Sequence, residues 1–95
     1  MTTSRRPDEL ARIDAVMALV RGELIKATNG FGSFNSGHEG YAVIREELDE
    51  MWDEVKANRP DRAGEEAVQV AAMGARFVLD LALPYLTTDP ALAAS

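Results

Sequence analysis

Residues 65–83, EEAVQVAAMGARFVLDLAL, form a segment of helical length with almost no polar side. On a helix, its apolar residues line two different sides: Val68, Ala72, Ala75 and Leu79 on one, and Val70, Phe77 and Leu81 on another. A helix that is apolar around most of its circumference must be covered on several sides. The chain has only 95 residues, so two more helices of its own would cover this one poorly. We therefore expect an all-α fold that a second subunit completes.

Two other segments repeat apolar residues every three or four positions, as amphipathic helices do. The first is predicted over about residues 8–28 and ends at an Asn-Gly pair. The second is predicted over about residues 38–58, with Ser36 or Gly37 near its N-cap. Its expected apolar stripe consists of Tyr41, Ile44, Leu48, Met51, Trp52 and Val55, so Trp52 is assigned to the core.

The third helix is predicted over about residues 62–83, with Pro84 ending or kinking it. The connection before it, NRPDR, is short, and its Asp61 is a candidate N-cap. So short a link makes the second and third helices antiparallel neighbours. Residues 84–95 form a tail with one more helical turn after Asp89. Strand alternation and internal repeats are absent from the sequence, which predicts a single domain over residues 1–95, built as an antiparallel helical bundle.

The second helix carries an unusual density of acids. The stretch REELDEMWDE, residues 45–54, has six carboxylates and one basic residue, so like charges recur at three- and four-residue spacing. On a helical projection the acids other than Asp49 occupy an arc of roughly 120°, on the side away from the apolar stripe, with Glu47 at the border. A solvated charged face is the ordinary explanation for such a run. The scarcity of interleaved cations weakens that explanation.

A narrow polar stripe runs along the otherwise apolar third helix. Its members, within roughly 80° of arc, are Arg62, Glu66, Gln69, Arg76 and Asp80. Ionisable groups in apolar surroundings stay charged only when they are paired or bound to a metal. A structural salt-bridge seam and a ligand site are both consistent with this stripe. Facing the acidic run of the second helix, it would create a carboxylate cluster of the kind that hard divalent cations require.

Composition excludes several classes of protein. The chain has no cysteine, so disulfides and thiolate metal sites are unavailable, and this suits a cytoplasmic protein. A net charge of −6 argues against binding to a nucleic-acid polymer, which needs a basic face. The N-terminal residues lack the apolar stretch of a signal peptide. The apolar run of residues 67–83 is interrupted by polar residues, so we expect no membrane association.

At this level of detail the chain resembles the MazG-like superfamily of all-α nucleoside triphosphate pyrophosphohydrolases. The signature of that family is E-E-x-x-E, a gap and E-x-x-D. This chain has Glu46-Glu47-Leu48-Asp49-Glu50 and then, after fifteen residues, Glu66-Ala67-Val68-Gln69. The order of helices covers about residues 8–83. The resemblance implies a helical dimer or tetramer that holds Mg²⁺, with Mn²⁺ as an alternative, and hydrolyses a nucleoside triphosphate to a monophosphate and pyrophosphate.

The resemblance also implies roles for particular residues. Glu47, Glu50 and Glu66 match metal ligands, and Glu46 matches an acid that assists the site or orients the attacking water. Glu46 or Glu50 would accept the proton from water. Gln69 stands where the family has an aspartate, and its amide oxygen can coordinate Mg²⁺ without contributing charge.

Candidate substrate-binding residues lie outside the acidic motifs. Phe31 and Phe34, in the Gly-, Asn- and Ser-rich segment 29–37, could stack on a base, although a plug over the core is the commoner role of such aromatics. His38 could contact the base or a phosphate. Arg62 and Arg76 are candidate phosphate clamps.

A different class of function stays open. The chain could be a non-catalytic helical dimer that acts as an adaptor or regulatory interaction protein. Its small size and the Gln69 departure both permit this alternative.

Overall fold

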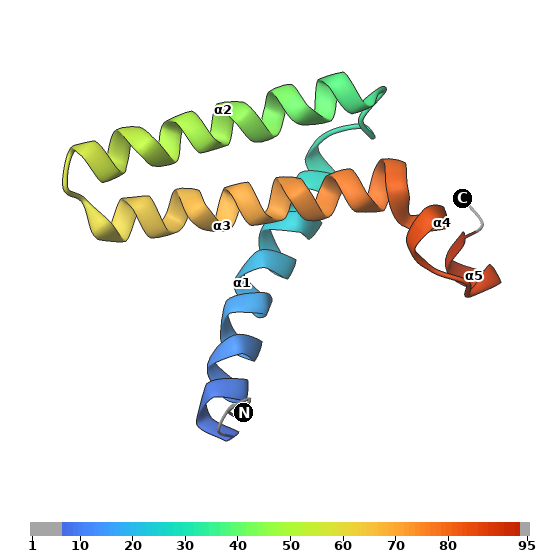
Figure 1. The fold of residues 1–95 in the computed structure, drawn as a ribbon, viewed down its shortest axis with the longest axis horizontal. Coiled ribbons are helices and arrows are strands. Elements are labelled where there is room, and N and C mark those ends of the chain that lie inside the picture. Colours follow the sequence, from blue (N-terminus) through green and yellow to red (C-terminus); the bar gives the residue numbers. More distant parts are fainter. Residues whose placement is uncertain (1–6, 94–95) are drawn as a thin grey trace, which may run out of the picture.

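The computed structural model describes residues 7–93, and every regular element in that range is a helix (Figure 1). In chain order the elements are α1 (Pro7–Gly30), α2 (Gly37–Lys56), α3 (Pro60–Phe77), a π-helical turn η1 (Val78–Ala82), α4 (Leu83–Leu86) and α5 (Pro90–Ala93). The all-α prediction is therefore confirmed for this range, and α5 supplies the helical turn expected after Asp89.

Helices α2 and α3 form an antiparallel hairpin, as predicted from their short connection (Figure 1). Ser36 caps α2 by accepting a hydrogen bond from the backbone N–H of Glu39 at 3.1 Å. At the other end, Asn58 adopts a left-handed φ of 60°, and the N–H groups of Asn58 and Arg59 bond to the carbonyls of Val55 and Glu54. This pattern satisfies the last carbonyls of the helix and reverses the chain within a few residues.

The start of α3 differs from the prediction. The helix begins at Pro60, with Arg59 at the N-cap position and no side-chain cap, so Asp61 lies inside the first turn instead of capping it. Proline suits this position because the first N–H groups of a helix have no intrahelical acceptor. An acidic residue in the first turn still interacts favourably with the helix dipole.

The end of α3 also differs from the prediction. Regular α-helix stops at Phe77, and the widened turn Val78–Ala82 follows, in which the N–H of Leu83 bonds to the carbonyl of Val78. Pro84 explains the widening, because proline has no N–H and its ring would collide with the carbonyl four residues earlier in a regular helix. The disturbance therefore appears one turn before Pro84, and the helix continues as α4 to Leu86.

Helix α3 is the centre of the fold, since it packs against both α2 and α1. The small core contains Val20 and Ala27 from α1 and Ala72 and Met73 from α3, with Val43, Ile44 and Val68 packed against it. The N-terminal half of α1 extends away from the hairpin (Figure 1). The bundle predicted from the sequence is thus only partly closed within one chain.

Much apolar surface is left uncovered. Large side chains that are more than 40% exposed include Leu10, Ile13, Val16, Met17 and Leu19 on α1 and Tyr41, Leu48, Trp52 and Val55 on α2. The radius of gyration is 15.5 Å, whereas about 12 Å is expected for a compact chain of this length. The assignment of Trp52 to the core was wrong for the single chain, because α1 crosses α3 and does not reach this side of α2.

One helical stretch within residues 7–93, Pro60–Leu86, is long and apolar enough to cross a membrane by length and composition alone. Only 17% of its most apolar window is buried inside the structure. A helix that packs in a protein core or interface passes the same test, so the absence of membrane association stays a prediction.

Candidate metal centre and adjoining cavity

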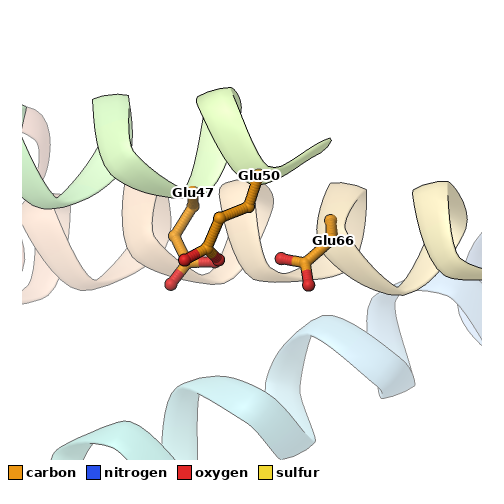
Figure 2. Close-up of side chains that lie close together, drawn as sticks. All are labelled: Glu47, Glu50 and Glu66. Atoms are coloured by element: carbon orange, nitrogen blue, oxygen red, sulfur yellow. The ribbon is translucent and has the colours of Figure 1, made fainter. Parts of the chain in front are cut away.

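Three carboxylates from two helices converge in the hairpin. Glu47 and Glu50 of α2 and Glu66 of α3 each have an oxygen atom within 4.8 Å of the others (Figure 2). Glu47 and Glu50 are three residues apart and so project from the same side of α2. The antiparallel pairing brings Glu66, sixteen positions later in the chain, to the same place. We call these residues the carboxylate triad.

Burial and nearby negative charge disfavour the ionised forms of two triad residues, Glu47 and Glu66. The pKa of Glu47 is raised to about 7, first because burial penalises the carboxylate and then because Glu50 lies nearby. The pKa of Glu66 is raised as well, again mainly by burial and then by the charge of Glu50. Within residues 7–93, no ion pair joins the triad to a cationic side chain. A bound cation would supply the missing charge.

The other acids of α2 are mostly engaged elsewhere. Glu39 accepts hydrogen bonds from the backbone and side chain of Asn35, Asp53 pairs with Lys56 at 3.6 Å, and Glu54 pairs with Arg59 at 2.5 Å. The acidic run seen in the sequence is therefore divided: Asp53 and Glu54 are paired with cations, Glu47 and Glu50 belong to the triad, and Glu46 lines a cavity described below. This division depends on the position of α3 and of the loops at both ends of α2.

A cavity of about 460 Å³ adjoins the triad. Its apolar wall consists of Ala27, Phe31, Phe34, Val43 and Met73, and its polar residues are Glu23, Lys26, Glu39, Glu46, Glu47, Gln69 and Arg76. Glu47 belongs to both the triad and the cavity, so the two form one continuous site. The volume and the mixed lining are typical of small-molecule sites.

The loop between α1 and α2 is held over this cavity by Arg76 and Asp80. Arg76 Nη2 donates a hydrogen bond to the carbonyl of Gly32 at 2.6 Å, and Asp80 Oδ2 accepts one from the backbone N–H of Phe34 at 3.0 Å. The Arg76 guanidinium also lies 4.0 Å from the ring centre of Phe34 and 3.7 Å from Asp80. Phe34 is buried, as a plug would be, while Phe31 is 69% exposed.

The structure separates the predicted substrate-binding residues. Phe31, Phe34 and Arg76 line the cavity, whereas His38 and Arg62 are exposed residues in the first turns of α2 and α3 and do not line it. Arg76 is buried, and its guanidinium is committed to the loop and to Asp80. These contacts already occupy the guanidinium, and they therefore oppose a role of Arg76 as a phosphate clamp.

Gln69 lies at the cavity wall, where its side chain is the main cause of a lowered pKa at Glu23 of α1. Sequence reasoning missed Glu23 and its neighbour Lys26. One signal was available: Glu23 lies three positions after Val20 and four before Ala27, two residues that face α3. That position places Glu23 on the inner side of α1.

Comparison with known proteins found no match to this chain among family models, curated proteins or solved structures. The resemblance to the MazG-like superfamily therefore depends on the two acidic motifs and the order of the helices.

Proposed function

We propose that this protein is a Mg²⁺-dependent nucleoside triphosphate pyrophosphohydrolase of MazG-like type. The observation that carries the proposal is the convergence of Glu47, Glu50 and Glu66 beside a cavity with an aromatic wall. A carboxylate cluster alone is common on protein surfaces. A cluster in which the pKa values of Glu47 and Glu66 are raised, and which adjoins a cavity for a small molecule, is more specific support.

The donor set suits a hard cation. Mg²⁺ prefers oxygen ligands, and it commonly combines one or two carboxylates with water and substrate phosphates. Glu47, Glu50 and Glu66 would hold it, with Gln69 as a further, neutral oxygen donor. Mn²⁺ accepts the same ligands and is an alternative. When bound, the ion would neutralise phosphate charge and lower the pKa of a neighbouring water.

The residues of the chain would bind and position the substrate. Water would add to the α-phosphorus while the bond to the bridging oxygen of the β-phosphate breaks, which gives a monophosphate and pyrophosphate. Glu46 lines the cavity next to Glu47 and would accept the proton of that water, with Glu50 as the other candidate. Phe31 has an exposed face on which a base can stack.

The exposed apolar surface supports a homo-oligomer, either a dimer or a tetramer. Residues such as Ile13, Met17 and Trp52 are 43–56% exposed in the single chain. So many exposed apolar side chains in a small protein are typical of one that binds a partner. The same surface supports the second candidate function, a non-catalytic adaptor that uses the helical assembly for binding and has lost turnover.

The decisive test is an assay with a panel of nucleoside triphosphates plus Mg²⁺ or Mn²⁺ that distinguishes pyrophosphate from orthophosphate release. We expect pyrophosphate from the wild type and none from Glu47→Gln or Glu50→Gln. Asp53→Asn is the matched control, since Asp53 is an acid of α2 that pairs with Lys56 outside the triad. Failure of the wild type with every nucleotide, together with no effect of metal on its melting temperature, would favour the adaptor.

A further inference from the structure

The cavity has a polar edge at which Glu23 and Lys26 have no role in the proposed hydrolysis, while Gln69 is also a candidate metal ligand. Glu23 and Lys26 of α1 and Gln69 of α3 line the cavity together with the apolar wall of Phe31 and Met73. The two helices reach this edge from different parts of the chain, so it exists only in the folded protein. Any base stacked on Phe31 would lie within the same cavity as these three side chains.

The three polar side chains already interact with one another. Lys26 Nζ lies 3.4 Å from Glu23 Oε1, and Gln69 is the hydrogen-bonding partner that most lowers the pKa of Glu23. Paired with the Lys26 ammonium, the Glu23 carboxylate can only accept hydrogen bonds. Its side chain is 29% exposed, so part of the carboxylate remains accessible to a ligand.

The edge presents a defined set of hydrogen-bonding groups. The carboxylate of Glu23 offers two acceptor oxygens side by side, and Lys26 and the Gln69 amide offer donors next to them. Among the common bases, guanine has the matching pattern: two adjacent donors, N1–H and the 2-amino group, beside the O6 acceptor. Uracil and thymine have one ring N–H between two carbonyls, and hypoxanthine differs from guanine only by lacking the 2-amino group.

We propose that Glu23 makes this site selective for guanine nucleotides, by accepting hydrogen bonds from N1–H and the 2-amino group while Lys26 or Gln69 donates to O6. The proposal rests on the proposed function, because it places the nucleoside of the substrate in the cavity beside the triad. A bidentate contact between a carboxylate and a base edge discriminates by about tenfold or more. When the bound base lacks the 2-amino group, one acceptor oxygen of Glu23 is left without a hydrogen bond. The cost of that unpaired group is the physical source of the selectivity.

The test compares guanosine and inosine triphosphates, which differ only in the 2-amino group. We expect the wild type to prefer the guanosine nucleotide by at least about tenfold in kcat/KM, with most of the difference in KM. Glu23→Gln should reduce that preference to within about twofold. Asp14→Asn, which removes one acid from an exposed position of the same helix outside the cavity, should leave the preference unchanged.

Binding without turnover provides a second readout. The dissociation constants of the α,β-methylene analogues of both nucleotides are measured by calorimetry in the presence of Mg²⁺, for the wild type and for Glu23→Gln. A preference for the guanosine analogue that disappears in Glu23→Gln supports the role of Glu23 even if no nucleotide is hydrolysed, in which case only the proposed hydrolysis fails.

Two results overturn the inference. If nucleotides are hydrolysed but the two purines differ by less than twofold, or the preference survives in Glu23→Gln, Glu23 does not select the base and the hydrolytic function stands without it. If neither analogue binds and neither nucleotide is hydrolysed, the cavity is not a nucleotide site and both proposals fall.

Discussion

Asp80 Oδ2 accepts a hydrogen bond from the backbone N–H of Phe34 at 3.0 Å, across 46 positions of the chain. Asp80 lies in the widened turn η1, and both it and its neighbour Arg76 have side chains less than 10% exposed. The two residues thereby fasten the loop that carries Phe31 and Phe34 to the end of α3. The π-helical turn and the aromatic loop are parts of one arrangement that shapes the cavity.

Breaking the buried ion pair should destabilise the fold strongly. Arg76→Met leaves the Asp80 carboxylate buried without its cation, so we expect a loss of about 3 kcal/mol in the free energy of unfolding, measured with urea. The double variant Arg76→Met with Asp80→Asn should recover part of that loss, because the amide oxygen still accepts from Phe34 and no charge remains buried. Equal losses in the single and double variants would contradict this explanation.

Gly40 is required for close packing of α2 against the aromatic residues. A Cβ at this position would lie 2.6 Å from Phe77 Cδ2 and 3.3 Å from Phe34 Cδ2. We expect Gly40→Ala to cost about 1–3 kcal/mol of stability because the packed rings must shift. Gly22→Ala is the matched control, since nothing lies within 4 Å of its added Cβ, and it should stabilise α1 by about 0.5–1 kcal/mol. Similar effects of the two substitutions in thermal unfolding would refute the packing argument.

Glu47→Gln should have opposite effects with and without metal. Without metal, the substitution removes a repelling carboxylate and should raise the melting temperature by roughly 4–8 °C, which corresponds to about 1 kcal/mol. With Mg²⁺ at 100 times its dissociation constant, the wild type should gain about 2.7 kcal/mol and the variant much less. An equal Mg²⁺-induced shift in both proteins would remove Glu47 from the metal site.

The metal-free protein should lose stability as the pH rises through the range of the triad. The folded pKa of Glu47, about 7, lies above its ordinary value of 4.5, so the folded state holds this proton more tightly than the unfolded state does. The resulting stabilisation is fully present below about pH 4.5, is lost between pH 4.5 and 7, and is absent above that range. Urea unfolding of the wild type and Glu47→Gln at each pH isolates this contribution, which should be missing from the variant.

Metal affinity should change with pH in the other direction. Mg²⁺ competes with the proton on Glu47, so its apparent affinity should rise by up to about tenfold per pH unit below pH 7 and level off above. Calorimetric titration between pH 5.5 and 8.5 measures this dependence. A flat profile would mean that Glu47 does not coordinate the ion.

The exposed apolar residues of α1 should lie in a subunit interface. Met17 is 54% exposed, so Met17→Ser should cost a monomer little beyond helix propensity, but it should weaken an assembly that covers the side chain. Light scattering over a dilution series measures the change, and Ala18→Ser controls for the effect of serine on the helix.

The fluorescence of Trp52 gives a second measure of assembly. Trp52 is 56% exposed in the single chain, so its emission should shift to shorter wavelength if assembly covers it. A monomer at all concentrations would exclude the oligomer.

The carboxylate triad shows how far the sequence led. The resemblance to the MazG-like superfamily singled out Glu47, Glu50 and Glu66 as metal ligands, and the short connection predicted that the two helices pair in antiparallel fashion. The structure brings one oxygen of each of these carboxylates within 4.8 Å of the others. Of the two residues expected near the N-cap of α2, Ser36 and Gly37, the cap is Ser36. The metal itself, the hydrolysis and the MazG-like relationship stay proposals.

The position of α1 shows where sequence reasoning ended. Its periodicity predicted a helix, but not that its N-terminal half would extend from the hairpin or that Glu23 would meet Gln69 at the cavity wall. The sequence left Arg76 as either a phosphate clamp or part of a salt-bridge seam, and the structure buries it 3.7 Å from Asp80. Trp52 looked like a core residue and is exposed in the single chain.

The sequence by itself determined what depends on neighbouring residues: the helices, their main caps and breaks, and which side chains share a helical face. Hydrogen bonds and steric restrictions within about four residues decide these features. Only the tertiary structure decided which faces meet, and therefore which acids are paired, which form the triad and which line the cavity. Such contacts join positions tens of residues apart. They depend on how α1 and α2 both pack on α3, and a pattern within a few residues of sequence does not contain that information.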